Sequence, residues 1–287
     1  MKKLLSNLII ILPIILAIFF MGGFSGANLL KENSEEQAIA KKGVPLVILM
    51  YHEISNRKST DYILPISIFE DDLKFLADNG YTSIFMADLI CHIENSTPLP
   101  AKPVMITFDD GGRTDYTNAF PLLKKYNTKA VISVVGRYTD RAYDENGQIN
   151  GVYTNSLTYE HMKEMLDSGL VEIQNHTYNL HSLTCRKGLK NIKNEDLGEY
   201  EKLLTEDLAK LDNQLYKHLG IKPTTIAFPY GAYSKQTIEI IKRLGYKASL
   251  TCNEGVNYIN KDTNLYLLKR YNRAPSRDIS KLLQAKV

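Results

Sequence analysis

The sequence of 287 residues has little cysteine, no glycine-rich nucleotide motif and no long basic run. Its three cysteines, Cys91, Cys185 and Cys252, lack metal-type spacing and define no disulfide framework. Basic and acidic residues nearly balance at a net charge of +3, which argues against a dedicated nucleic-acid binder. No dinucleotide fingerprint or phosphate loop follows a predicted strand, and this absence weakens a nucleotide-binding function.

The N-terminus carries a long apolar segment. Lys2 and Lys3 precede it, and no charged residue appears again until Lys31. The segment exceeds the roughly 20 apolar residues that cross a bilayer, and the paired lysines favour a cytoplasmic N-terminus. We expect residues 1–27 to be either an uncleaved membrane anchor or a signal peptide cut after a small residue such as Ala27. The rest of the chain would then lie outside the cell membrane, or be secreted.

The remaining chain divides into a polar linker, residues 28–43, and one domain, residues 44–287. In this domain apolar runs alternate with stretches of helical periodicity. The predicted strands are residues 45–51, 82–85, 103–108, 130–135, 170–174, 224–228, 247–251 and 265–270. Repeated strand–helix units predict an α/β fold with a parallel sheet and helices outside it. Their number favours a barrel over an open doubly wound sheet.

Polar residues able to do chemistry follow several predicted strands directly. His52, the pair Asp109 and Asp110, and His176 each follow an apolar run, and Tyr230 lies in "AFPYG" after another. An isolated Asp-Asp-Gly would be an ordinary turn. In a β/α barrel, however, the carboxyl ends of the strands converge on one mouth, where catalytic groups are placed. Several such residues together therefore indicate a site.

Two histidines in "NHTYNLH" suggest a metal. His176 and His181 are five residues apart, which suits neither one helical face nor one strand face, so they would converge from a loop. A histidine pair is more often structural or exposed. Two imidazoles plus one carboxylate are nevertheless a usual ligand set of a catalytic zinc, which keeps a position for water. A carboxylate at another strand end would complete this set.

The segments "TFDDGGRTDYTNAFPLLKKYNTKAVISVVG", "HTYNLH" and "AFPYG" resemble the polysaccharide deacetylase family, the NodB-type carbohydrate esterases. The similarity runs from about residue 44 to residue 273. It implies a distorted (β/α)7-8 barrel, the NodB homology fold, as a single catalytic domain. It also implies a metal-dependent hydrolase that removes N-acetyl groups from a cell-surface or cell-wall polysaccharide containing N-acetylglucosamine, and releases acetate.

The resemblance assigns a role to each motif residue. Asp109 would be the general base, and Asp110, His176 and His181 would hold the metal. Tyr230 would offer its backbone N–H to the oxyanion. The expected cofactor is a divalent cation, Zn²⁺ first, with Co²⁺, Ni²⁺, Fe²⁺ or Mn²⁺ as alternatives.

Three departures from the commoner family pattern matter. The histidine spacing is five rather than four, which resembles the poly-N-acetylglucosamine deacetylase-like subgroup. No histidine follows His218, so the acid that protonates the leaving amine is assigned to His52 in "LMYHEI", as in that subgroup. The arginine that holds the base near the third motif is also missing, and Arg270 or Arg273 could replace it.

Two other functions remain open from the sequence. A barrel glycosidase would need carboxylates about 5–9.5 Å apart across the scissile bond, which adjacent aspartates do not readily provide. A non-catalytic glycan-binding barrel would not need a complete set of base, acid and ligands. The expected partners are an N-acetylated polysaccharide and the membrane, with no nucleic acid, and the chain is expected to be a monomer. The polysaccharide itself stays open between poly-N-acetylglucosamine, peptidoglycan and another wall polymer.

Overall fold

The computed structural model describes residues 43–143, 147–149 and 155–284. The predicted anchor or signal peptide, residues 1–27, and all but the last residue of the predicted linker, residues 28–43, lie outside this part of the chain. Among the described residues, no helix combines the length and apolar character needed to cross a membrane. The residues from Pro45 onward form one compact unit, which contains all the features that follow.

Nine strands form one sheet in this described part, in the order β10-β1-β5-β6-β7-β8-β9, with β11 beside β1 and β4 beside β5. Neighbours from β1 through β9 in this order pair in parallel. The strands are β1 (Val44–Tyr51), β4 (Thr82–Ser83), β5 (Pro103–Asp110), β6 (Ala130–Val134), β7 (Val171–Asn175), β8 (Thr225–Ala227), β9 (Ala248–Leu250), β10 (Asn257–Ile259) and β11 (Tyr271–Asn272). A separate pair is β2 (Glu53–Ile54) with β3 (Ile63–Leu64).

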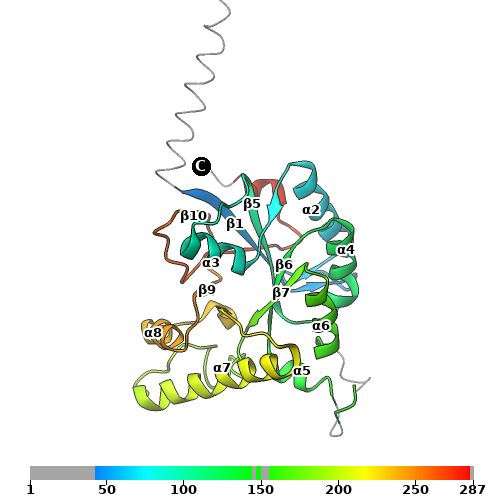
Figure 1. Cartoon of the computed structure of the whole chain (residues 1–287). Helices are drawn as coiled ribbons and strands as arrows, with labels where there is room; N and C mark the ends of the chain where they lie inside the picture. The colour runs from blue at the N-terminus through cyan, green and yellow to red at the C-terminus, as the bar shows by residue number, and fades with distance from the viewer. Residues whose placement is uncertain (1–42, 144–146, 150–154, 285–287) are drawn as a thin grey trace, which may run out of the picture. The chain divides into compact units, whose positions relative to one another are not determined.

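Helices connect most of the strands, as the alternating pattern predicts. They are α2 (Ile66–Asp78), α3 (Met86–Asn95), α4 (Phe120–Lys125), α5 (Gly136–Asp140), α6 (Tyr159–Asp167), α7 (Leu197–Leu219), α8 (Lys235–Arg243) and α9 (Ile279–Leu283). Two short turns of other helix types, η1 (Asp115–Ala119) and η2 (Pro229–Gly231), follow β5 and β8. Figure 1 shows the sheet curling, with α2, α4 and α6 along one side of it. The predicted α/β fold is therefore confirmed, as a curled sheet that forms a half-barrel.

The alternation of side chains along β5 determines which residues reach each face of the sheet. Ile106 and Phe108 belong to the core that packs against α2, α4 and α6, whereas Met105 belongs to the core on the opposite face. Because successive side chains of a strand point to opposite faces, Thr107 and Asp109 share the face of Met105. Asp109 is thereby buried at the carboxyl end of the sheet, with 3% of its surface exposed.

The predicted strand at residues 265–270 is wrong. Leu267 has a φ of 65°, which breaks the extended backbone, and only one isolated bridge joins Leu268 to Leu250 of β9. The segment runs beside β9 in an irregular path, and strand pairing resumes only at β11. This irregular path carries the Arg270 side chain to full burial.

Candidate active site

The two carboxylates at the end of β5 diverge. Asp109 points to the buried face, whereas Asp110 has a φ of 78° and keeps about a third of its side chain exposed. Gly111 follows with a φ of 69°, and a Cβ there would lie 2.8 Å from Cγ1 of Val134, so this position requires glycine. A left-handed backbone at a non-glycine residue costs about 1–3 kcal/mol and is often found at functional sites. This strained turn separates the two acids.

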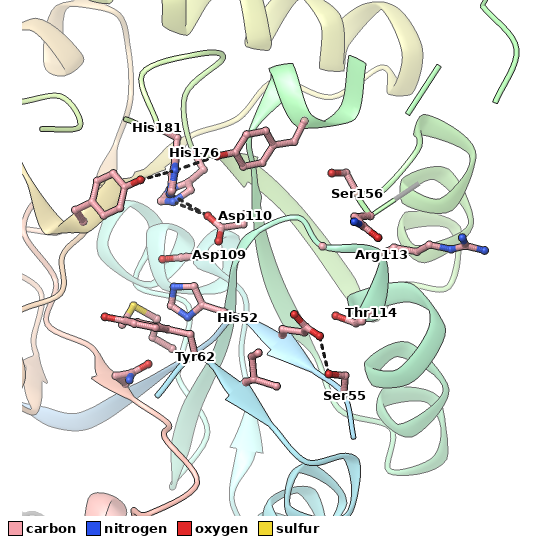
Figure 2. Close-up of a pocket in the computed structure, with 18 of the residues that line it drawn as sticks. His52, Ser55, Tyr62, Asp109, Asp110, Arg113, Thr114, Ser156, His176 and His181 are labelled. Carbon is pink, nitrogen blue, oxygen red and sulfur yellow. Dashed lines mark hydrogen bonds and ion pairs between the residues drawn. The ribbon is translucent and has the colours of Figure 1, made fainter. Parts of the chain in front are cut away.

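Asp110, His176 and His181 come together at the carboxyl ends of the strands. Asp110 Oδ1 lies 3.1 Å from His181 Nε2 and 3.5 Å from His176 Nε2. One donor atom from each of the three residues lies within 4.8 Å of the others. His176 follows β7 directly, and His181 returns from the loop after it, so the five-residue spacing does converge (Figure 2). Two imidazoles and one carboxylate form a three-ligand set.

In both histidines Nδ1, the ring nitrogen that faces away from Asp110, also has a polar partner. His176 Nδ1 lies 2.8 Å from the carbonyl oxygen of Ala227. His181 Nδ1 lies 3.0 Å from the hydroxyl of Tyr230 and 3.2 Å from that of Tyr138. Hydrogen bonds of this kind orient imidazole ligands and fix which nitrogen faces a metal. Both rings therefore present Nε2 to Asp110.

The charges around Asp110 and the two histidines suit a bound cation. Burial opposes the ionisation of Asp110, but His176 and His181 outweigh burial and hold the pKa of Asp110 far below its usual value. Burial likewise opposes a charged His176, but Asp109 and Asp110 raise its pKa. Asp110 Oδ1 is buried and faces both Nε2 atoms without a hydrogen bond of normal geometry. Donor types, spacing and local negative charge thus fit a divalent metal ion.

Asp109 pairs with Arg270. The two guanidinium terminal nitrogens each donate to one carboxylate oxygen at 2.7 Å, and Nε of Arg270 donates to the carbonyl of Thr251 at 2.9 Å. Burial opposes the ionisation of Asp109, but the Arg270 charge outweighs it and lowers the pKa of this carboxyl. Arg273 instead forms a buried pair with Asp72 of α2 at 2.7 Å. Of the two arginines expected near the base, the structure thus brings only Arg270 to Asp109.

His52 follows β1 and lies in the same pocket. Figure 2 shows its ring close to Asp109. Its Nδ1 is buried without a hydrogen bond in the described residues, and its ring packs edge-on against Tyr62 with centroids 4.8 Å apart. Burial lowers the pKa of His52, although Asp109 and Asp110 act in the opposite direction. The predicted base and acid therefore share one cavity with the three possible ligands.

Tyr230 lies in η2 with a φ of 57°, the third left-handed non-glycine residue at the site after Asp110 and Thr177. Its side chain lines the pocket and reaches His181. Gly231 follows, and a Cβ there would lie 2.8 Å from Cβ of Cys252. The close approach of η2 to Cys252 holds the backbone of Tyr230 at the pocket wall.

The pocket has a volume of about 1140 Å³. The predicted residues His52, Asp109, Asp110, His176, His181 and Tyr230 all line it. Sequence reasoning missed further lining residues, which include Tyr62, Arg113, Tyr138, Lys187 and Cys252. Tyr138 carried a usable signal, because it follows the predicted strand 130–135 and so belongs at the same mouth. Cys252 carried the same signal after the predicted strand 247–251, and so did Arg113 after the predicted strand 103–108.

Helix α7 holds the loop that carries the two histidines. Both carboxylate oxygens of Asp207 accept backbone hydrogen bonds, from Tyr178 N–H and from Asn179 N–H, each at 2.8 Å. Five residues further along α7, Asp212 accepts from the side-chain amide of Asn175 at 2.9 Å. Helix α7 thereby satisfies two N–H groups of the loop, while the carbonyls of Thr177 and Tyr178 accept from Gly136 and Arg137 of α5.

Comparison with known proteins decides the family. A profile described as polysaccharide deacetylase matches residues 96–249, more than half of the chain. The chain belongs to the polysaccharide deacetylase family. The resemblance first drawn from three short motifs is therefore confirmed.

Two relatives and one solved structure agree with this family. YxkH of Bacillus subtilis, described as a polysaccharide deacetylase, is 30% identical over 238 residues, which cover 82% of this chain and 74% of the relative. A poly-β-1,6-N-acetyl-D-glucosamine N-deacetylase of Staphylococcus aureus is 27% identical over 221 residues, or 77% of this chain and 71% of the relative. The structure of the Streptococcus pyogenes deacetylase PplD in complex with acetate superposes with a TM-score of 0.68 at 29% identity. That match covers 85% of this chain and 98% of PplD.

The chain is thus a polysaccharide N-deacetylase, and its candidate metal site consists of Asp110, His176 and His181. Family membership favours deacetylation over the barrel glycosidase. A complete set of candidate ligands argues against the non-catalytic glycan-binding barrel.

Proposed function

We propose that this deacetylase removes N-acetyl groups from a cell-surface or cell-wall polymer that contains N-acetylglucosamine, and releases acetate. One observation carries the proposal: the Asp110–His176–His181 set shares a cavity with His52 and with Asp109, whose buried partner is Arg270. The Staphylococcus aureus relative, named for poly-β-1,6-N-acetyl-D-glucosamine, supports this substrate class. Peptidoglycan and other wall polymers carry the same amide and remain alternatives.

Asp110, His176 and His181 would hold the divalent cation, with Zn²⁺ expected and Co²⁺, Ni²⁺, Fe²⁺ or Mn²⁺ as alternatives. When bound, the cation supplies Lewis acidity, which acidifies water and polarises the amide carbonyl. The positive charge would also offset the repulsion between the neighbouring Asp109 and Asp110 carboxylates.

Asp109 is proposed as the general base that takes a proton from the attacking water. Arg270 keeps this carboxylate ionised and fixed in orientation through its two hydrogen bonds. Each carboxylate oxygen has a second acceptor position beyond the one that Arg270 uses, so the base can still accept a proton. General acid–base help of this kind typically contributes about 10²–10⁴-fold in rate.

His52 is proposed as the acid that protonates the departing amine. The lowered pKa of His52 makes its imidazolium a stronger proton donor. The backbone N–H of Tyr230 is proposed to bind the oxyanion that develops as the amide is attacked. Loss of one such donor typically costs about 10²–10³ in rate.

The cellular location is proposed from the sequence. Residues 1–27 would anchor the enzyme in the cell membrane with the catalytic domain outside, or would be cleaved and leave it secreted. The N-acetylated polymers considered above all lie outside the membrane. We expect the enzyme to act there as a monomer.

The test is acetate release from defined chito-oligosaccharides, poly-N-acetylglucosamine and peptidoglycan, each with and without a chelator. We expect acetate from at least one polymer, loss of activity with chelator and recovery with Zn²⁺. Shortened glycan without acetate would establish the glycosidase instead. Glycan binding without acetate from any substrate would establish the non-catalytic barrel.

A further inference from the structure

The two histidines of the candidate metal set differ in the partner of their outer nitrogen. The carbonyl oxygen of Ala227 beside His176 Nδ1 can only accept a hydrogen bond. A neutral His176 therefore carries its hydrogen on Nδ1 and keeps the Nε2 lone pair toward Asp110. His181 Nδ1 instead contacts two phenol hydroxyls, those of Tyr138 and Tyr230. Dashed lines at His181 in Figure 2 mark its contacts with the two phenols, and a further one leads toward Asp110.

A hydroxyl can serve His181 in either tautomer, because it both donates and accepts. With the hydrogen on Nε2 toward Asp110, Nδ1 accepts a hydrogen bond from a phenol. With Nε2 free to bind a cation, Nδ1–H donates to a phenol oxygen. A carbonyl could serve only the second state. The phenols of Tyr138 and Tyr230 thus keep the ring in place in both states.

The two phenols reach His181 from different parts of the fold. Tyr138 comes from α5, directly after β6, and Tyr230 comes from η2 after β8. Their ring centroids lie 5.8 Å and 4.6 Å from the imidazole centroid, so the aromatic rings also pack against His181. His181 is more exposed than His176, 14% against 2% of the side chain, and it sits on a loop. It is the ligand whose orientation depends most on side-chain partners.

We propose that Tyr138 and Tyr230 are positioning residues that hold His181 with Nε2 toward Asp110 and so strengthen the binding of a divalent cation. This inference rests on the proposed function, because it needs the Asp110–His176–His181 set to bind a metal. Either phenol can satisfy Nδ1 alone, so the two act as partial substitutes for each other. Loss of both should cost more than the two single losses together.

The experiment measures Zn²⁺ affinity by competition with a chromophoric chelator, for Tyr138→Phe, Tyr230→Phe and the double variant. Phenylalanine keeps the ring packing and removes only the hydroxyl. Tyr233→Phe is the matched control, since the Tyr233 ring stacks on Phe228, whereas the phenols that contact His181 in the described part of the chain are those of Tyr138 and Tyr230. Loss of partners that orient a ligand typically weakens metal binding by about 10–100-fold. We expect that loss in the double variant, a smaller loss in each single variant, and less than about twofold in the control.

A second set of variants tests whether the effect passes through His181. In a His181→Ala background, the double tyrosine variant should cause no further loss of Zn²⁺ affinity, because the ligand that the phenols orient is gone. A double variant with wild-type Zn²⁺ affinity would overturn the proposal. So would a double tyrosine substitution that lowers Zn²⁺ affinity as much in the His181→Ala background as in the wild type.

Two outcomes outside this comparison are also decisive. If the double variant does not fold, the single variants decide, since at least one must bind Zn²⁺ more than about twofold more weakly. A wild-type enzyme that binds no Zn²⁺ or other divalent cation would refute the metal set, and with it both proposals. If the wild-type enzyme binds metal and the tyrosine variants bind it equally well, only the role of the phenols is refuted, and the metal set stands.

Discussion

Asp109 and Arg270 form a buried, bidentate ion pair across 161 residues of sequence. The two partners are 3% and 0% exposed, so almost no water screens the pair. A buried pair is weak support for stability by itself, but removal of one partner leaves an uncompensated charge. The pair thus ties the irregular segment between β10 and β11 to the end of β5. It fixes the proposed base in one orientation.

Arg270→Lys should lower the turnover of acetylated substrate by about 100-fold, because a lysine cannot reproduce the two parallel hydrogen bonds and the base would shift. Zn²⁺ affinity should stay near that of the wild type. The matched control is Arg273→Lys, which disturbs the Asp72 pair and should lower the unfolding free energy more than it affects turnover. Steady-state acetate release and chemical unfolding measure the two effects. An unchanged kcat in Arg270→Lys would show that Asp109 needs no such support.

Asp109→Asn and Asp110→Asn should have different effects, although the two residues are neighbours. Asp109→Asn removes the proposed base and spares the ligands, so it should retain metal while turnover falls about 10²–10⁴-fold. Asp110→Asn and His181→Ala should instead weaken metal binding. Metal content after dialysis, measured beside acetate release, separates the cases. Near-normal activity of Asp109→Asn on an N-acetylglucosamine oligomer would refute the assignment of the base.

Asp207→Ala should loosen the loop that carries His176 and His181. The substitution leaves the N–H groups of Tyr178 and Asn179 without their protein acceptor. Because Tyr178 is only partly buried and Asn179 is exposed, water can replace this acceptor, and the net cost is about 0.5–1.5 kcal/mol for each lost hydrogen bond. Amide hydrogen exchange across residues 176–181 should become faster. Glu206→Ala, at the neighbouring exposed position of α7, is the control. Unchanged exchange in this loop would show that α7 does not hold it.

Asp115→Asn should make the free energy of unfolding depend less on pH. Asp115 is fully buried at the start of η1, and neither carboxylate oxygen makes a hydrogen bond of normal geometry within the described residues. Burial, and then the Asp110 carboxylate, raise the pKa of Asp115 well above its usual value, although the nearby Gly112 backbone acts in the opposite direction. The unfolded chain therefore loses this proton at a lower pH than the folded chain. Wild-type stability must fall as pH rises between the two pKa values.

The stability advantage of Asp115→Asn should grow with pH in that window, by up to about 1.4 kcal/mol per pH unit. Urea unfolding from about pH 5 to about pH 8 measures this difference, with exposed Asp61→Asn as the control for the substitution itself. A difference between the variant and the wild type that stays constant across this range would mean that Asp115 is ionised in the folded enzyme.

Local sequence patterns were sufficient for most of the central parallel strands and for the family, but not for the segment at residues 265–270. The run before Asp109 reads as a buried strand because its apolar residues continue to the point where the carboxylates begin. The strand-end position of His52, Asp110 and His176 follows from the order of the elements, because parallel strands present their carboxyl ends at one edge. The motifs around these residues also identified the polysaccharide deacetylase family. These features depend on neighbours in sequence, and so the sequence alone determined them.

Only the tertiary structure decided which arginine meets the base and what holds the metal histidines. Arg270 and Arg273 carry the same charge three residues apart, and no local pattern separates them. The left-handed turn at Leu267 and the path beside β9 bring Arg270 to Asp109, while Arg273 reaches α2. The two phenols that contact His181 likewise come from separate strand ends. Such pairings join side chains that are far apart in the chain. They therefore depend on how distant segments pack, which no local sequence pattern encodes.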